Sequence, residues 1–439
     1  MTAKLRATLR LAAELLAYNL VLLSLIPVIL LWLAWRSLVL RKPAGNWRHR
    51  LGLVPRMDAD ASPRIWLHAV SAGEMNAALP VLSALRQRLP NAGIAVSTHT
   101  ETGMAVASKR ATEADILFFL PFDWADTIAL ALWRLQPDLV IVVEKELWPN
   151  LLGVSRLIGA RVVVINGRVS DRMMRRVCSV PWLVSWFYRL TNTLCVQSEH
   201  DAARLRRIGV SDEKIVVAGN TKIDTLAARD AEIEERLRAD LEIGDEEIWL
   251  VAGSTHEIEE EQIVDAFIRI RKREPRARLL LAPRHLDRVP LVSAMVAEHS
   301  LDVIRRSDGR NGGNDAVVIL DTMGELRAAY ALATAGFVGG TLVPVGGHNL
   351  LEPPAVGIPV LFGPHTENCP DAAELVREEG VGFLVFGSES LADEFLRLVY
   401  DNSLRAAVAQ RTRDMMARQR GAAARCAAVA ARLLSTGES

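Results

Sequence analysis

The stretch "RIWLHAVSAGEMNAALPVL" (residues 64–82) decides the fold that we expect for this chain. Residues 65–70 form a short apolar run, as in a buried strand, and the apolar spacing from about Met75 onward is that of a helix. Small residues and one carboxylate, Glu74, separate the two patterns. A strand that passes directly into a helix is typical of a βαβ unit, so we expect Glu74 at the carboxyl end of a parallel strand.

The alternation of strand and helix patterns continues along the chain in two series. The apolar runs of the first series are residues 64–70, 92–100, 115–123, 137–144, 160–167, 193–198 and 214–220, and those of the second are residues 247–255, 277–285, 315–321, 335–340, 358–363 and 381–386. Short β-branched runs between helical patterns predict parallel sheets with helices on both faces. The predicted fold class is α/β, with two Rossmann-like domains facing across a cleft at the carboxyl ends of their strands, where ligands bind.

Breaks in this pattern set the expected domain boundaries. The expected segments are a membrane anchor with a basic flank (residues 1–46), a first Rossmann-like domain (47–224), a charged helical linker (225–246), a second Rossmann-like domain (247–410) and a closing helix (411–439).

The charge of the chain is balanced overall but uneven along it. Lys+Arg and Asp+Glu both number 52 in 439 residues, so composition does not indicate a nucleic-acid partner. Residues 1–56 carry nine basic side chains and one acidic one, which suggests an anionic surface such as a membrane. The four cysteines lie far apart without a CxxC motif, which fits a reducing compartment and indicates neither a disulfide framework nor a zinc site.

Residues 15–35 form an uncharged, mostly apolar segment. Its 21 residues would cover roughly 30 Å as a helix, the thickness of the hydrocarbon core, so we expect one membrane-anchoring helix. The larger basic flank follows the segment, which favours a catalytic body on the cytoplasmic face. The alternative is a cleaved signal peptide, although the run is long for one and no A-x-A site follows.

The second half contains candidates for binding a phosphate-bearing ligand. Two glycine pairs and a helix start follow the strand at residues 335–340, and such backbone suits close approach of a phosphate, but there is no Walker lysine pattern and no GxGxxG. Arg284 follows another strand, and Glu352 precedes two prolines, where it could face a ligand. A solvated arginine and an N-x-x-E capping pair with Asn349 are the structural alternatives. Thr322 and Glu325 have the spacing of a capping box.

The first half contains carboxylates at strand ends. Glu74, Glu144 and Glu146 follow two strands of the first sheet, and a partly desolvated carboxylate at a cleft can act as a general base. Lys222 leaves a later strand toward the same side and could meet a leaving phosphate. A solvated edge and a surface lysine are the alternatives. No metal-binding pattern lies near these positions, so no metal or other cofactor is expected.

A basic stretch followed by aromatic residues lies at residues 168–190. It suits an anionic amphiphile at a membrane surface, and the alternative is a buried helix preceded by a basic loop. The candidate acceptor-surface residues are Arg168, Arg172, Arg175, Arg176, Trp182 and Trp186.

Several motifs together resemble one family, the 3-deoxy-D-manno-oct-2-ulosonic acid (Kdo) transferases of lipopolysaccharide assembly. In chain order they are "SAGE", "EKELWPN", "NGRVS", "GNTKID", "GSTHEIEEE", "PRH", "DTMGEL", "FVGGTLVPVGGHNLLEP" and "LFGPHT". The chain departs from the family at Lys145, where threonine is usual, and at Gly167, where alanine is usual.

The resemblance implies a GT-B glycosyltransferase at the bacterial inner membrane that transfers Kdo from CMP-Kdo to a lipid A precursor with inversion. It also implies that Glu74 is the general base and that Glu144 and Lys222 stabilise the transition state. The positions implied for CMP are Pro283, Arg284, Met323, Gly324, Glu325, Asn349, Leu350, Leu351 and Glu352.

Three alternatives remain open at this point. The first is a lipid-directed GT-B enzyme that uses a UDP-sugar, and the second is a sugar-nucleotide epimerase of the same fold. The third is a catalytically silent, membrane-tethered binding protein, against which the presence of both Glu74 and the nucleotide motifs argues.

Overall fold

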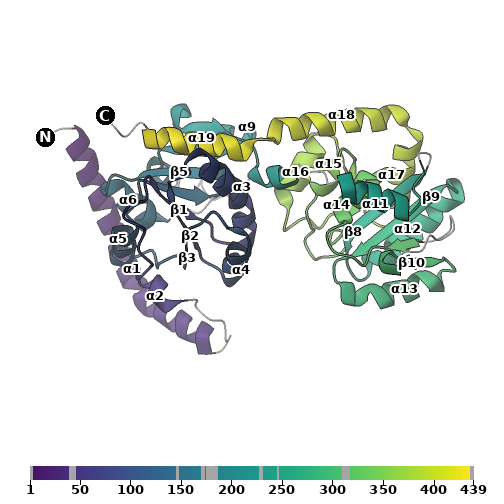
Figure 1. Ribbon diagram of the computed structural model, residues 1–439, viewed down its shortest axis with the longest axis horizontal. Helices are drawn as coiled ribbons and strands as arrows, with labels where there is room; N and C mark the ends of the chain where they lie inside the picture. Colours follow the sequence, from purple (N-terminus) through teal and green to yellow (C-terminus); the bar gives the residue numbers. More distant parts are fainter. Residues whose placement is uncertain are drawn as a thin grey trace. The chain divides into compact units, whose positions relative to one another are not determined.

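The computed structural model describes residues 3–38, 46–144, 148–169, 174, 186–226, 231–244, 247–308 and 317–435, with side chains in the first helix described up to residue 24. The chain divides into two compact units. Unit 1 comprises Met1–Asp224 and Gln419–Ser439, and unit 2 comprises Thr225–Arg418. Figure 1 shows a twisted sheet flanked by helices in each unit.

The sheet of unit 1 has seven parallel strands in the order β3-β2-β1-β4-β5-β6-β7. They are β1 (Arg64–His68), β2 (Gly93–Thr98), β3 (Ile116–Phe119), β4 (Leu139–Val143), β5 (Arg161–Gly167), β6 (Thr193–Val196) and β7 (Ile215–Val217). Every one of these strands lies within a run predicted from the sequence. The strands are apolar on both faces because helices cover both sides of the sheet.

The described helices of unit 1 lie in two layers. They are α1 (Ala3–Leu38), α2 (Trp47–Arg50), α3 (Ala72–Arg88), α4 (Glu101–Arg110), α5 (Ala125–Leu135), α6 (Pro149–Leu157), α9 (Glu199–Arg207), α10 (Thr221–Leu226) and α19 (Ala422–Ser435), with a 3₁₀ turn η1 (Asp212–Lys214). Helices α3, α4 and α19 pack on one face of the sheet, and α1, α5 and α6 pack on the other (Figure 1). The C-terminal helix therefore completes the core of the first unit.

The sheet of unit 2 also has seven parallel strands, in the order β10-β11-β9-β8-β12-β13-β14. They are β8 (Ile248–Thr255), β9 (Ala277–Pro283), β10 (Val303–Arg305), β11 (Val317–Ile319), β12 (Ala335–Val338), β13 (Val360–Phe362) and β14 (Gly382–Leu384). The edge strand β10 was not predicted from the sequence. The two sheets confirm the predicted pair of Rossmann-like α/β domains.

The helices of unit 2 cover its sheet in the same way. They are α11 (Ala231–Asp240), α12 (Glu259–Arg273), α13 (Val289–Glu298), α14 (Leu326–Ala331), α15 (Glu352–Ala355), α16 (Pro370–Glu378), α17 (Ser388–Tyr400) and α18 (Asn402–Gln419), with 3₁₀ turns η2 (Leu286–Arg288) and η3 (Arg306–Asp308). Helices α12, α13 and α17 enclose the main apolar core on one face.

Two segments differ from the expected boundaries. Residues 225–246, expected as a linker, group with unit 2, because α11 packs on α14 and Arg236 pairs with Glu325. Residues 411–439 were expected as one closing helix, but their described part, residues 411–435, belongs to two helices separated at Gly421, whose positive φ of 76° suits glycine. Helix α18 lies almost wholly in unit 2, whereas α19 returns to unit 1.

The N-terminal helix α1 is partly built into unit 1. Leu15, at the start of the predicted membrane segment, is buried against α6, and Tyr18 and Asn19 form hydrogen bonds to Asp123 and Asn150. Within the described part of the chain, no helix is both long enough and apolar enough to cross a bilayer. The expected span therefore lacks support from the structure, and its first residues contact protein.

Candidate active site

In unit 1, the order in which strands are added to the sheet reverses between β1 and β4. The chain proceeds from β1 to β2 and β3 on one side, and from β4 to β5 and beyond on the other. In open α/β sheets, ligands bind outside the carboxyl ends of the strands at such a switch point. Glu74 follows β1 and Glu144 follows β4, so two of the predicted catalytic residues flank this position.

Glu74 is fixed in the first turn of α3. The helix begins at Ala72, three residues earlier than expected, because the Ser71 hydroxyl caps it by accepting a hydrogen bond from the Glu74 N–H. The Glu74 carboxylate in turn accepts a hydrogen bond from the Val70 N–H through Oε2, at 2.6 Å. This reciprocal arrangement is close to a capping box and holds the carboxylate, half-buried, at the end of β1.

The loop that carries Glu74 is also anchored to the neighbouring strand. The carbonyl of Val70 accepts hydrogen bonds from the backbone N–H groups of His99 and Thr100 and from the hydroxyls of Thr98 and Thr100. Val70 therefore links the end of β2 to the strand-to-helix turn. The position of Glu74 is set by these backbone contacts and does not depend on a flexible loop.

Glu144 forms an ion pair with Lys222. Its Oε1 accepts hydrogen bonds from Lys222 Nζ at 2.8 Å and from Asn166 Nδ2 at 3.3 Å. The Glu144 side chain is 12% exposed and that of Lys222 41% exposed, so the pair lies at the rim of the sheet. The structure thus brings together two of the residues that the sequence predicted.

Asn166 organises this ion pair and was not predicted. It is buried at the end of β5, and its Oδ1 accepts a hydrogen bond from the N–H of Thr221, next to Lys222. Both Asn166 and Glu144 have positive φ, 53° and 61°, a conformation that is costly for residues other than glycine. Lys145 and Glu146, which follow Glu144, lie outside the described residues.

Unit 2 has a second switch point, between β8 and β12. Glu259, the first residue of α12, is buried there and accepts hydrogen bonds from the N–H groups of Gly340 at 2.6 Å and His256 at 2.8 Å. Burial raises the pKa of Glu259 to about 7, against the opposing effect of these hydrogen bonds. Glu259 therefore ties the start of α12 to the glycine-rich loop that follows β12.

Three histidines from different loops meet at this switch point. His256 Nε2 lies 2.7 Å from His348 Nε2, and the two rings are stacked with centroids 5.0 Å apart. The His285 ring lies edge-on to His256 at 5.7 Å. Burial, with His256, Arg284 and His285 nearby, lowers the pKa of His348 to about 4. Burial also lowers the pKa of His256, so His256 and His348 are neutral near pH 7 and could gain protons beside an anion.

The predicted nucleotide residues divide into two groups. Arg284, Asn349 and Glu352 lie in the loops around the histidine cluster, and the Glu352 carboxyl, whose pKa burial raises, is close enough to Arg284 for the two charges to interact. Helix α15 begins at Glu352 itself, so Glu352 lies in the first turn rather than before it. Pro283, Leu350 and Leu351 are buried.

The segment 323–325 follows β11 and differs from the expected capping box. Met323 is 78% exposed and Gly324 has a positive φ of 92°. The Glu325 carboxylate accepts hydrogen bonds from Thr322, Arg236 and Arg306. Burial alone would raise the pKa of Glu325, but these donors lower it below its usual range. Glu325 occupies the N-cap position of α14, but its side chain accepts no hydrogen bond from the N–H groups of that helix.

Known proteins are similar to this chain over most of its length. Residues 45–225 match the family model described as 3-Deoxy-D-manno-octulosonic-acid transferase (kdotransferase). A 3-deoxy-D-manno-octulosonic acid transferase of Haemophilus influenzae is 33% identical over 83% of this chain and 86% of its own length. The chain belongs to the Kdo transferase family. Its enzymatic class is therefore glycosyltransferase.

Two further comparisons mark the breadth of the similarity. A bifunctional glycosyltransferase/methyltransferase of Fusobacterium nucleatum is also 33% identical over 76% of this chain, but the chain spans 52%, about half, of that relative's length. The solved UDP-GlcNAc 2-epimerase of Neisseria meningitidis covers 85% of this chain and 100% of its own at 14% identity, with a TM-score of 0.57. The second comparison shows that the fold is shared, and no more.

The predicted acceptor surface of this Kdo transferase is described only in part. Arg168 is half-buried, whereas Arg172, Arg175, Arg176 and Trp182 lie outside the described residues. Trp186 is buried, not surface-exposed as expected, because its indole packs near Tyr18 and donates a hydrogen bond to Glu14 Oε2 at 2.6 Å. At Trp186 the alternative of a buried helix describes the structure better.

Sequence reasoning missed the residues that position others in this Kdo transferase. These are Asn166, His256, Glu259, His285 and His348. Each lies in a quoted motif. Asn166 lies at the end of β5, and the other four lie in segments that follow β8, β9 or β12, which was the available signal. Among the described residues, no group of His, Cys, Asp and Glu side chains is arranged to hold a metal ion.

Proposed function

We propose that this Kdo transferase transfers Kdo from CMP-Kdo to a lipid A precursor, with inversion at the anomeric carbon. The observation that carries the proposal is the switch point of unit 1, where Glu74 follows β1 and Glu144, paired with Lys222, follows the neighbouring strand β4. A carboxylate and a cation are thereby fixed at the edge of the sheet where ligands of this fold bind.

Each of these residues has a separate role in the proposed transfer reaction. A hydroxyl oxygen of the acceptor forms a bond to the anomeric carbon of Kdo while Glu74 takes the proton of that hydroxyl. The bond between the anomeric carbon and the phosphate oxygen of CMP breaks, and CMP leaves with the electron pair. Glu144 and Lys222 stabilise the charges that develop, and attack opposite to the leaving group inverts the configuration.

Unit 2 supplies the features expected of a CMP site. Arg284 is exposed beside the half-buried Glu352 and the histidine cluster, and the glycine-rich loop after β12 brings backbone close to the same edge. Arginine and imidazole groups suit the single phosphate of CMP, which carries less charge than a diphosphate. The small number of positive groups therefore supports a CMP-sugar as the donor. A UDP-sugar remains the alternative donor.

We further propose that the enzyme works at the cytoplasmic face of the bacterial inner membrane. The nine basic side chains within residues 1–56 and the apolar segment 15–35 support this location. The helix that contains this segment contacts unit 1 through its first half, so membrane contact would involve its outer face or its later residues.

One experiment tests the reaction. The purified protein is incubated with a CMP-Kdo generating system and a tetra-acylated lipid A precursor, and the lipid product is weighed by mass spectrometry. We expect a mass gain of one or more Kdo units, and none with Glu74→Gln on the same timescale. Transfer from a UDP-sugar with none from CMP-Kdo would favour the alternative.

A further inference from the structure

We propose that unit 1 carries a second, non-catalytic binding site for the phosphate of an anionic phospholipid. It lies at the amino ends of the strands, and Glu74 and Glu144 lie at the carboxyl ends. The site is a pocket of about 380 Å³ between α1, the end of α6 and the turn before β6. Arg156 lies in the last turn of α6, and Arg189 and Leu190 precede β6. The pocket therefore lies at the amino ends of the strands, and a ligand there would not take part in transfer.

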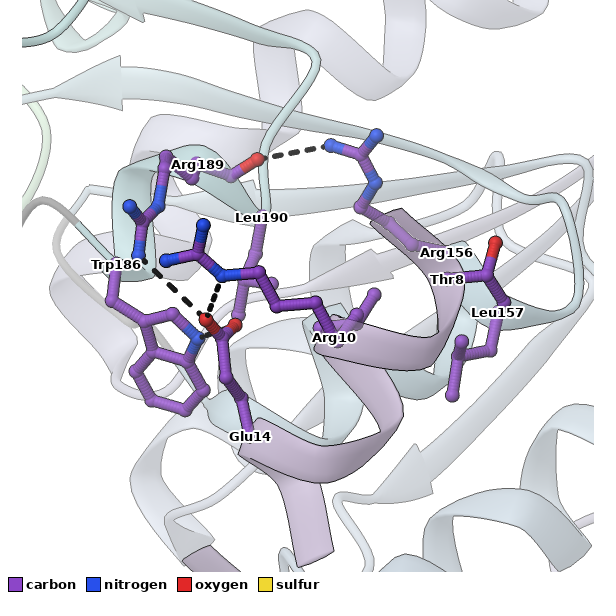
Figure 2. Close-up of a pocket in the computed structure, with 9 residues that line it drawn as sticks. Thr8, Arg10, Glu14, Arg156, Leu157, Trp186, Arg189 and Leu190 are labelled. Atoms are coloured by element: carbon purple, nitrogen blue, oxygen red, sulfur yellow. Dashed lines mark hydrogen bonds and ion pairs between the residues drawn. The ribbon is translucent and has the colours of Figure 1, made fainter. Parts of the chain in front are cut away.

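The pocket has an excess of positive charge. Arg10, Arg156 and Arg189 line it together with one carboxylate, Glu14. Figure 2 shows the guanidinium groups of Arg10 and Arg189 turned toward that carboxylate, and the Arg156 guanidinium turned toward the Arg189 carbonyl. Within the part of the chain that the structure describes, the lining thus carries three cations and one anion.

Glu14 is already fully engaged by protein groups. Its Oε1 lies 2.9 Å from Arg10 Nε and 4.0 Å from Arg189, and its Oε2 accepts the Trp186 indole N–H. One carboxylate shared in this way cannot neutralise three guanidinium groups. An added phosphate would supply the missing negative charge and could accept hydrogen bonds from the arginines.

The cations around the pocket also repel one another. Burial lowers the pKa of Arg156, and the positive charge of Arg161 lowers it further. Lys214 donates hydrogen bonds to the carbonyls of Arg189 and Thr191, and burial together with Arg156 and Arg189 lowers its pKa. A bound anion would relieve this repulsion, which favours binding of a phosphate group.

Helix α1 indicates that the phosphate belongs to a lipid. Leu9, Leu16, Leu20 and Leu23 are between 52 and 62% exposed. Their spacing of seven, four and three residues places them within a sector of roughly 60° around the helix, away from the buried Leu15. The same helix that lines the pocket through Arg10 and Glu14 therefore presents an apolar stripe to its surroundings.

A bilayer surface fits both features at once. An amphipathic helix that lies in the membrane interface buries its apolar face at the boundary of headgroups and acyl chains, with cations beside it at headgroup level. The occupant that we assign is a phospholipid with a net negative headgroup. This inference rests on the proposed membrane location and is independent of the Kdo chemistry.

The test uses flotation of the purified full-length chain with vesicles of phosphatidylcholine containing zero to 40% phosphatidylglycerol. The double variant Arg156→Gln/Arg189→Gln should bind vesicles rich in phosphatidylglycerol roughly 10- to 30-fold more weakly than wild type. The matched control Arg88→Gln/Arg207→Gln, which removes two exposed arginines outside the pocket, should bind within about twofold. An equal loss in both variants, or no dependence of wild-type binding on phosphatidylglycerol, would overturn the proposal.

Two further arms identify the source of the phosphate and guard against misfolding. Leu9→Gln/Leu16→Gln changes exposed residues, so folding should persist while vesicle binding falls; undiminished binding contradicts the lipid assignment. Inorganic phosphate, at matched ionic strength, should not displace the protein from vesicles, and displacement would indicate a site for free phosphate.

Transfer in detergent micelles should be the same for wild type and Arg156→Gln/Arg189→Gln. A raised acceptor KM would instead assign the pocket to the acceptor, whereas a lack of transfer in wild type would refute only the proposed function.

Discussion

Glu74 combines a structural and a proposed catalytic task in one carboxylate. It accepts the Val70 N–H and occupies the first turn of α3. Glu74→Gln keeps an oxygen for that hydrogen bond but removes the base, and general-base catalysis typically contributes about 10²–10⁴-fold. We expect the single-turnover transfer rate to fall by that factor while CMP affinity, measured by calorimetry, stays close to wild type because the residues proposed to bind CMP belong to unit 2.

A second substitution separates the two tasks. Glu74→Ala also removes the acceptor of the Val70 N–H, so we expect the free energy of unfolding to fall by about 0.5–2 kcal/mol, as for other lost caps. Glu74→Gln should unfold at nearly the same denaturant concentration as wild type. A transfer rate unchanged in Glu74→Gln would assign the base to another carboxylate, and a collapse of CMP affinity would make Glu74 a structural residue.

The histidine cluster should make unit 2 sensitive to acid. His348 has a pKa of about 4 in the folded chain against 6.5 in the unfolded chain, mainly through burial. Between these values the unfolded chain binds a proton that the folded chain does not, so the free energy of unfolding should fall as the pH is lowered from 6.5 to 4. His348→Gln should lose this part of the slope in urea titrations at several pH values.

Glu259 provides an internal contrast for that measurement. Its pKa of about 7 lies above that of an unfolded glutamate, so its contribution to stability falls as the pH rises through 4.5 to 7. The wild-type profile contains both slopes, and the difference between wild type and His348→Gln isolates the histidine. Parallel stability profiles for wild type and His348→Gln would show that the pKa of His348 is the same in the folded and the unfolded chain.

Individual site residues were predictable where a strand end carried them. Glu74, Glu144 and Lys222 each follow a predicted strand. In the structure, Lys222 Nζ lies 2.8 Å from Glu144 Oε1. His256 and His348 were not predicted as partners, because they are 92 residues apart and meet only through the order of β8 and β12 in the sheet. Sequence spacing does not reveal which loops share a sheet edge.

At the scale of elements, strands were easier to predict than the attachment of helices. The apolar runs identified β1 to β7 because a strand covered on both faces has few polar residues. Helix α19 has a sequence pattern that does not tell which core it covers, and the structure buries its Cys426 and Ala427 against the sheet of unit 1. Helix α11 was similarly expected in a linker because it is highly charged, yet it packs on α14.

Helix α1 allows a direct test between a membrane-spanning and a protein-packed first half. Leu15 is 4% exposed and packs near Gly153 of α6, whereas its neighbour Leu16 is 62% exposed. Leu15→Ala should lower the free energy of unfolding by about 2–4 kcal/mol, in the range for buried leucines, and Leu16→Ala should change it by less than about 0.5 kcal/mol. The measurement is urea unfolding in detergent. Equal effects of the two substitutions would contradict the packing of α1 on unit 1.

At the scale of the whole molecule, both units have a seven-stranded parallel sheet with a switch point, but the strand orders differ and so does the chemistry at the two switch points. Unit 1 presents Glu74 and the Glu144–Lys222 pair, and unit 2 presents Arg284 and three histidines. The first set suits proton removal and charge stabilisation, and the second suits an anion. In the proposed reaction, unit 1 would serve the acceptor and unit 2 the donor.

The division predicts that nucleotide protects one unit more than the other. A ligand that binds only the folded state raises its stability by RT ln(1 + [L]/Kd), about 2.7 kcal/mol at a concentration of 100 Kd. With CMP, hydrogen exchange should slow in the core strands β8, β9 and β12 of unit 2 and change little in β1 and β4 of unit 1. UMP and UDP should protect less than CMP at equal concentration, and Arg284→Gln should lose most of the protection. Equal protection by UDP would favour a UDP-sugar as donor, and protection confined to unit 1 would refute the assignment of the nucleotide to unit 2.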